Sequence, residues 1–140
     1  MKKMTFVLCA GALFAVTAIV GAQATKSTND AVFSEEQAKR GDALYKEQCA
    51  ACHGDNLEGT GPMPALAGKD FLANWQGKTV GDLFEKTQTS MPATAPGSLS
   101  PEQAADIVAY MLSVGKSPAG SAALEGKMEV LSQIKLEAPK

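Results

Sequence analysis

Two cysteines and a histidine stand together in this chain of 140 residues, in the run Cys49-Ala50-Ala51-Cys52-His53. Two thiols three positions apart can form thioether bonds to the two vinyl groups along one edge of a porphyrin. The next residue is then carried beneath the ring, where an imidazole can bind the iron as an axial ligand. His53 is the only histidine of the chain, so no other imidazole competes. The pattern predicts one covalently attached haem c.

The first 24 residues have the pattern of a secretory signal peptide. Lys2 and Lys3 precede an uncharged apolar run, and small residues surround an expected cleavage site after Ala24. The apolar run, 6–20, has about 15 residues, whereas a membrane-spanning helix needs roughly 20. We therefore expect cleavage, no membrane span afterwards, and a periplasmic protein of residues 25–140.

Cleavage would remove Cys9 and leave the two thiols of the motif as the only ones in the mature chain. A disulfide or thioredoxin-like pair is one alternative, but such pairs sit between a strand and a helix, and no strand pattern precedes Cys49. A zinc site is another alternative. Structural zinc takes four ligands and catalytic zinc three plus water, so two cysteines and one histidine make a poor set.

The net charge limits the kinds of partner that this chain can bind, and its small size limits the stability of the domain. The whole chain has a net charge of −2, and loss of the two lysines of the leader makes it −4. An acidic balance argues against nucleic acid as a partner. A chain this small with 13 Gly and 7 Pro has a thin core, which a bound cofactor would help to stabilise.

The elements around the motif are predicted to be helices. Residues 25–33 form a polar lead-in, and Ser34 with Gln37 makes a capping box that starts a helix running to Cys49. The Gly- and Pro-rich segment 54–68 contains apolar residues that a solvated linker would not need, so we expect an ordered loop. A short helix is expected over 70–75.

Two further helices follow. Thr79 can cap a helix over 80–86, and Ser100 with Gln103 forms a second capping box, with a proline at the first helical position. Apolar residues at helical spacing continue that helix through Met111, and Gly115 is expected to end it in the left-handed conformation. Residues 116–140 are a tail with apolar positions that we expect to pack on the domain. No convincing strand appears.

The second iron ligand is expected to be a methionine, because cytochromes that carry electrons usually hold iron between His and Met. Met91 is the preferred candidate, since Pro92 restricts it to extended geometry and stiffens the loop. Met63 lies in the loop expected on the histidine side of the ring. Met111 belongs to the apolar stripe of a helix, and Met128 to the tail. The alternative is an iron with an open position.

Residues 34–115 resemble the class I c-type cytochromes. The resemblance rests on the helix that leads into the Cys49–His53 motif, the Gly-Pro loop, the Ser90-Met91-Pro92 segment and the capped last helix. It implies an all-α fold of three to four helices packed around one haem. More narrowly, the chain looks like the small cytochromes that accompany quinoprotein alcohol dehydrogenases, with Trp75 among the residues that prompt this match.

The resemblance also implies roles for individual residues. A proline carbonyl would accept a hydrogen bond from the haem histidine, and Pro64 fits best, with Pro62 as the alternative. Trp75 would donate its indole N–H to a haem propionate. The close crossing of the first and last helices would involve Gly41, Tyr45 and Tyr110. Three apolar residues would line the haem pocket: Leu66, Leu83 and Phe84.

The expected function is single-electron transfer between redox proteins, with no substrate bond made or broken. The resemblance implies a quinoprotein dehydrogenase as donor and a terminal oxidase as acceptor, and we expect a monomer. The alternative is a haem sensor or a peroxidase-like protein with a displaceable distal ligand. Arg40 is the only arginine and His53 is already used, which disfavours peroxidase chemistry. A subunit of a dehydrogenase complex is a further possibility that the sequence does not separate from a free carrier.

Overall fold

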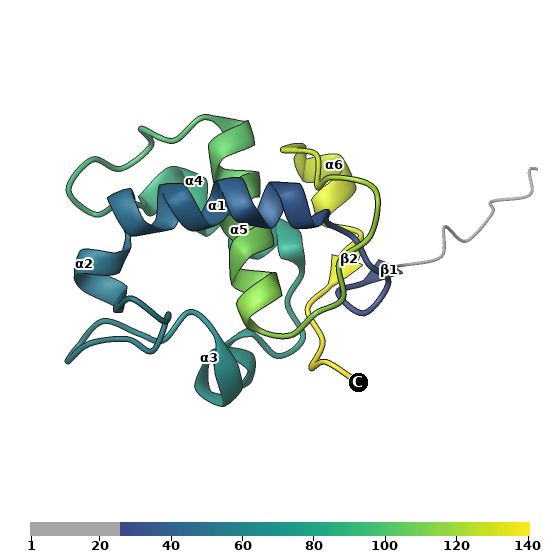
Figure 1. The fold of residues 1–140 in the computed structure, drawn as a ribbon, viewed down its shortest axis with the longest axis horizontal. Helices are drawn as coiled ribbons and strands as arrows, with labels where there is room; N and C mark the ends of the chain where they lie inside the picture. Colours follow the sequence, from purple (N-terminus) through teal and green to yellow (C-terminus); the bar gives the residue numbers. More distant parts are fainter. Residues whose placement is uncertain (1–25) are drawn as a thin grey trace, which may run out of the picture.

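The computed structural model describes residues 26–140, so the predicted signal peptide lies outside the described part. Helices dominate the described residues (Figure 1). The elements in chain order are β1 (Lys26–Ser27), α1 (Glu35–Gln48), α2 (Ala50–His53), α3 (Gly68–Trp75), α4 (Val80–Ser90), α5 (Pro101–Val114), α6 (Met128–Leu131) and β2 (Ile134–Lys135). The all-α fold predicted from the sequence is therefore correct, with α2 and α6 as additional short helices.

Helices α1 and α5 cross at the centre of the molecule (Figure 1). A Cβ atom at Gly41 would lie 1.9 Å from the backbone oxygen of Asp106, so only glycine permits this approach. Tyr45 and Tyr110 fill the space beside the crossing, with ring centroids 5.4 Å apart. Arg40 adds a bidentate ion pair to the Asp106 carboxylate, at 2.8 and 2.9 Å. The crossing fixes the direction in which α1 delivers its C-terminal end.

Three serine and threonine caps start the principal helices. Ser34, Thr79 and Ser100 each accept a hydrogen bond from the backbone N–H three residues later, which satisfies an otherwise unpaired donor. The boxes at Thr79 and Ser100 are reciprocal. The box predicted at Ser34 is only half correct, because the side-chain amide of Gln37 points to Leu124 instead.

The end of α5 differs from the prediction. Gly115 has φ −68° and ψ 1°, and the left-handed residue is Lys116, with φ 69°. The amide of Gly115 still bonds to the carbonyl of Met111, so the helix continues for one more peptide before the chain turns. Glycine was the expected choice because it adopts positive φ without steric cost. Here Lys116 adopts that conformation, and the amide of Ser117 donates to the carbonyl of Leu112 at 3.0 Å.

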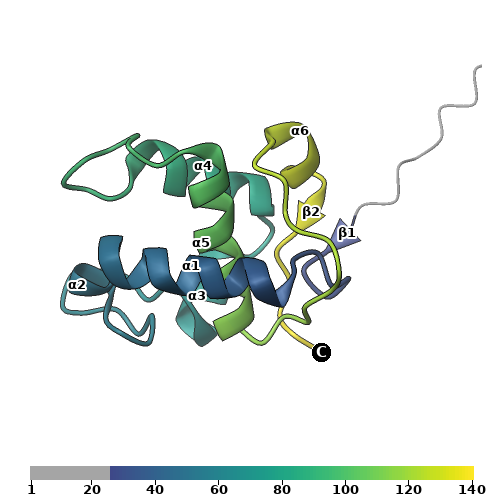
Figure 2. The same cartoon turned by 45° about the horizontal axis from the view of Figure 1, so that its top comes forward.

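Residues 116–140 pack along the side of the domain away from α2 (Figures 1 and 2). The amide of the buried Gln37 side chain forms two hydrogen bonds with the backbone of Leu124, at 2.7 and 3.0 Å. Helix α6 then packs on α4, where a Cβ at Gly81 would lie 2.8 Å from the nitrogen of Ser132. Four apolar tail residues are buried: Leu124, Leu131, Ile134 and Leu136.

The last part of the tail also binds the start of the described chain. Strand β2 pairs with β1 in parallel, with Lys26 opposite Ile134, and the hydroxyl of Thr28 donates to the carbonyl of Glu137 at 3.1 Å. Phe33 is 1% exposed and contributes to the core. The segment 25–33 was predicted as a polar lead-in and no strand was expected. Both predictions missed this pairing, because strands of two residues carry no periodicity.

Within residues 26–140, none of the helices has the length and hydropathy that a membrane crossing requires.

Candidate haem attachment site

The C-terminal end of α1 places the two thiols. Cys49 caps α1, and its amide bonds to the carbonyl of Tyr45. Helix α2 then carries Cys52 and His53 within one turn. Both thiols are free, Cys49 half-buried and Cys52 exposed. Burial raises the pKa of the Cys49 thiol to about 11, with the neighbouring Cys52 as a smaller cause. The Cys49 sulfur is therefore uncharged at neutral pH.

His53 is buried and oriented by the loop that follows. Its Nδ1 lies 2.8 Å from the carbonyl oxygen of Pro64. A carbonyl only accepts hydrogen bonds, so this contact places the proton on Nδ1 and leaves the lone pair on Nε2. Nε2 is therefore the nitrogen that could bind an iron atom. The carbonyl in this position is that of Pro64 and not that of Pro62.

The loop from Gly54 to Ala67 is ordered by bonds back to the motif. Gly59 donates its amide to the carbonyl of His53 at 2.8 Å, and the Thr60 hydroxyl donates to the carbonyl of Cys52. At Gly59, with φ 80°, a Cβ would lie 2.6 Å from the backbone oxygen of Met63. Leu57 is completely buried. The ordered loop predicted from its apolar residues is therefore present.

Tyr45 connects the helix crossing to this loop. Its hydroxyl donates to the carbonyl of Gly54 at 2.6 Å, directly after the histidine. Burial raises the pKa of the Tyr45 phenol above its usual range, so the hydroxyl stays a donor. Sequence reasoning assigned Tyr45 to helix packing alone and did not single out Thr60. Neither hydrogen bond has a sequence signal, because each depends on how the loop turns back.

The candidate methionine ligand stands at the end of α4. Met91 is the C-cap residue of that helix, half-buried and extended, with φ −121° and ψ 153°. The loop after it projects at the same end of the molecule as α2 and the 54–67 loop, and the two loops lie apart in both views (Figures 1 and 2). The other methionines of the described chain differ in position: Met111 is buried in α5, while Met63 and Met128 are exposed.

The remaining predicted residues lie on α3, on α4 and in the loop before α3. Leu83 and Phe84 of α4 are buried, and Leu66 is half-buried against the core. Trp75 ends α3 and is half-buried, with its ring centroid 5.9 Å from that of Phe71. The Lys78 ammonium lies 5.9 Å from the Trp75 ring centroid. Leu83 and Phe84 thus belong to the hydrophobic core, Leu66 packs against it, and Trp75 forms an aromatic pair within α3.

The donor set of the described chain fits a haem better than a metal ion alone. Within residues 26–140, no three His, Cys, Asp or Glu side chains gather as a metal site would require. The three or four ligands that zinc takes in proteins are therefore not gathered in that part of the chain. Two free thiols one helical turn apart, followed by a buried imidazole with an available Nε2, fit a covalently attached haem c. When bound, haem c supplies an Fe(III)/Fe(II) couple.

Comparison with known proteins supports the same identification. Residues 36–111 match the family described as "Cytochrome C oxidase, cbb3-type, subunit III". The thiosulfate dehydrogenase of Stutzerimonas stutzeri (strain A1501) is 35% identical over 97 residues, which cover 64% of this chain and 31% of that protein. Cytochrome c of Cannabis sativa is 28% identical over 95 residues, covering 52% of this chain and 86% of that protein.

A solved structure has a related fold. A chain in the crystal structure of the sulfane dehydrogenase SoxCD from Paracoccus pantotrophus superimposes with a TM-score of 0.55 at 26% identity. The match covers 76% of this chain and 61% of that chain. The present chain therefore spans under a third of the thiosulfate dehydrogenase and under two thirds of the SoxCD chain. The chain belongs to the cbb3-type subunit III family of c-type cytochromes, as a monohaem class I cytochrome with covalently attached haem c.

Proposed function

We propose that this protein is a periplasmic electron carrier whose haem iron is held between His53 and Met91. The observation that carries the proposal is the 2.8 Å contact between His53 Nδ1 and the carbonyl of Pro64. It fixes the tautomer and the direction of the only imidazole, and it does so beside two free thiols. A hydrogen-bonded partner of this kind sets the orientation and the basicity of a ligating histidine.

Met91 is proposed as the second ligand because of its place in the fold. The loop after Met91 and the loop that orients His53 lie apart at one end of the molecule (Figure 1), which supports two ligands that reach one haem from different loops. Thioether sulfur favours the reduced iron. The apolar side chains of Leu66, Leu83 and Phe84 would exclude water and disfavour the more positive oxidation state. Trp75 is proposed to donate its indole N–H to a propionate.

The partners are proposed to be redox proteins. Two relatives are dehydrogenases by name, of thiosulfate and of sulfane sulfur, which supports a dehydrogenase as electron donor. A quinoprotein alcohol dehydrogenase remains the donor proposed from the sequence, with a terminal oxidase as acceptor. The ferric protein can be mixed with a thiosulfate dehydrogenase and thiosulfate, or with a quinoprotein alcohol dehydrogenase and ethanol. The physiological donor should be the one that reduces the haem rapidly.

Optical spectroscopy tests the ligands. The purified protein should keep its haem through acid–acetone extraction and give a c-type pyridine haemochrome spectrum. Met91→Ala should abolish the far-red band of Met-ligated ferric haem and lower the reduction potential. Met63→Ala, a methionine of the other loop, is the matched control and should keep both. Loss of the band in Met63→Ala alone would move the ligand to Met63.

The open-site alternative gives a different result. A sensor or peroxidase-like protein should bind carbon monoxide rapidly in the ferrous wild type, whereas a Met91-ligated iron should bind it only after Met91→Ala.

Export is tested separately by measuring the mass of the intact protein. The protein from a periplasmic extract should begin at Thr25 and carry the mass of one haem, and retention of residues 1–24 would contradict the predicted cleavage.

A further inference from the structure

Two chain segments without charged residues border the end of the molecule that carries Cys49 and Cys52. Residues 59–68 and 87–101 contain no Asp, Glu, Lys or Arg, although charged residues make up 20% of the sequence. Charged residues resume at their borders, with Asp55 and Glu58 before the first segment and Glu102 after the second. Long uncharged stretches are common in buried elements, but the middle of each of these segments is exposed.

The fold brings both segments to the end of the molecule that carries the thiols. The Thr60 hydroxyl bonds to the carbonyl of Cys52, and Thr60 and Met63 exchange two backbone hydrogen bonds in a tight turn. The loop between α4 and α5 projects at the same end (Figures 1 and 2). We call the exposed residues of this region the neutral end face. They are Ala51, Cys52, 60–64 and 93–98.

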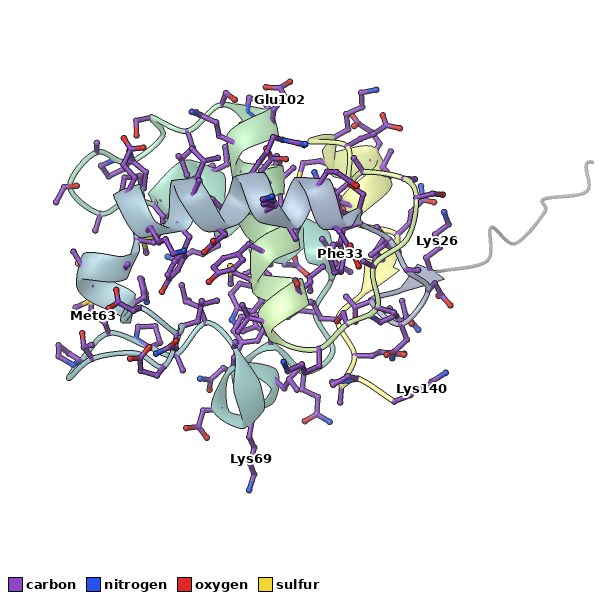
Figure 3. The ribbon with its side chains drawn as sticks, in the orientation of Figure 1. Lys26, Phe33, Met63, Lys69, Glu102 and Lys140 are labelled. Atoms are coloured by element: carbon purple, nitrogen blue, oxygen red, sulfur yellow. The ribbon has the colours of Figure 1, made fainter. Side chains whose placement is uncertain are left out.

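The neutral end face is apolar as well as uncharged. Met63 is 39% exposed and lies at this end in Figure 3. It stands beside Pro62 and Pro64. In the loop between α4 and α5, Ala93, Ala95 and Pro96 are exposed. Among residues 26–140, the other exposed large hydrophobic side chains are Met128 and Val130, both on α6. An exposed apolar area with a polar border is typical of an interaction site.

We propose that the partner is a redox protein that covers the neutral end face with an apolar, uncharged surface of its own. This inference rests on the proposed electron transfer through the haem of this site. A charged partner surface would lose hydration here without gaining an opposite charge, and charge-free contact gives no long-range steering. Docking therefore depends on apolar contact close to Cys52, the exposed thiol of the motif, and is insensitive to salt.

Voltammetry of the holoprotein on coated gold provides partner surfaces of known chemistry. The probes are alkanethiol monolayers ending in mixed methyl and hydroxyl groups, in carboxylates or in amines. Wild type should exchange electrons fastest on the uncharged monolayer. That rate should change by less than about twofold when salt shortens the Debye length from about 30 to about 3 Å.

Two methionine variants distinguish the effect of a charge within the neutral end face from the effect of the same charge elsewhere on the molecule. Met63→Lys places an ammonium in the neutral end face and should lower the rate on the uncharged monolayer about tenfold, because the charge must be desolvated on contact. Met128→Lys adds the same charge at a methionine of similar exposure, 37% against 39%, on α6. Its rate should match that of wild type.

The outcomes keep this inference separate from the proposed function. A reversible couple that is fastest on the amine monolayer and lost at high salt would overturn the neutral docking face and leave the carrier intact. The absence of any reversible haem couple would overturn the carrier itself. Sedimentation of the wild type as a dimer that Met63→Lys dissociates would assign the face to a second copy of this chain and overturn the proposal.

Discussion

Replacing Gly41 with alanine tests the close crossing of α1 and α5 through the sign of its effect. In a helix interior, alanine is favoured over glycine by about 1 kcal/mol, so local propensity alone predicts a more stable protein. The crossing predicts the opposite. The new Cβ would lie 1.9 Å from the backbone oxygen of Asp106 and 2.9 Å from the Cβ of Tyr110.

The magnitude follows from how far the helices must separate. Ordinary contact begins at 3.4 Å, so α1 and α5 must move apart by about 1.5 Å, the difference between 3.4 and 1.9 Å. A gap of that size loses much of the dispersion energy of the crossing, and overpacking of this kind costs about 3 kcal/mol. After subtraction of the propensity gain, the free energy of unfolding should fall by about 2 kcal/mol or more.

Guanidinium unfolding of the holoprotein, followed by far-UV circular dichroism, measures this change. Ala43→Gly at an exposed position of the same helix is the control and should cost about 1 kcal/mol through propensity alone. A Gly41→Ala protein as stable as wild type, or more stable, would refute the argument that backbone contact sets the distance between α1 and α5.

Three further changes test other contacts. Tyr45→Phe removes the 2.6 Å bond to the Gly54 carbonyl and should cost about 1–2 kcal/mol in urea unfolding; an unchanged midpoint would mean the bond is replaced. Leu131→Ala in the 1% exposed tail position should cost about 2–5 kcal/mol, whereas a loosely attached tail would give no change. Hydrogen bonds from Thr79 lower the pKa of Asp82 below its usual 3.8. The stabilisation by this carboxylate is therefore present above pH 3.8 and lost as the pH falls through the lower folded pKa. Unfolding at pH 7 and at lower pH should show the cost of Asp82→Asn shrinking in acid, and a constant cost would contradict the linkage.

Local signals in the sequence predicted the elements that depend on neighbouring residues. The caps at Thr79 and Ser100 start α4 and α5 at the predicted positions, because a cap and its helix lie within four residues of each other. The end of α4 was placed too early, at Lys86 instead of Ser90. The last turn of that helix has threonine and serine, which have weak helix propensity.

Contacts between distant residues were beyond the sequence. Arg40 and Asp106 are 66 positions apart, and Gln37 and Leu124 are 87 apart. No periodicity links such pairs, so the glutamine was assigned to its own helix start. The same reason applies within the site. The motif spacing predicted the two thiols and the imidazole as haem ligands, but only the path of the loop decides which proline carbonyl, Pro64 or Pro62, faces Nδ1.

The pairing of β1 with β2 has a practical consequence for attaching this protein to something else. It holds Lys26 beside the C-terminal strand, and Figure 3 places Lys26 and Lys140 on the side opposite Met63. A surface linker or a fused domain joined near Lys26 or Lys140 would therefore leave the neutral end face, with Cys52, unobstructed. An immobilised or fused form should keep its electron exchange with soluble redox proteins, with the orientation supplied by the fold instead of by the linker.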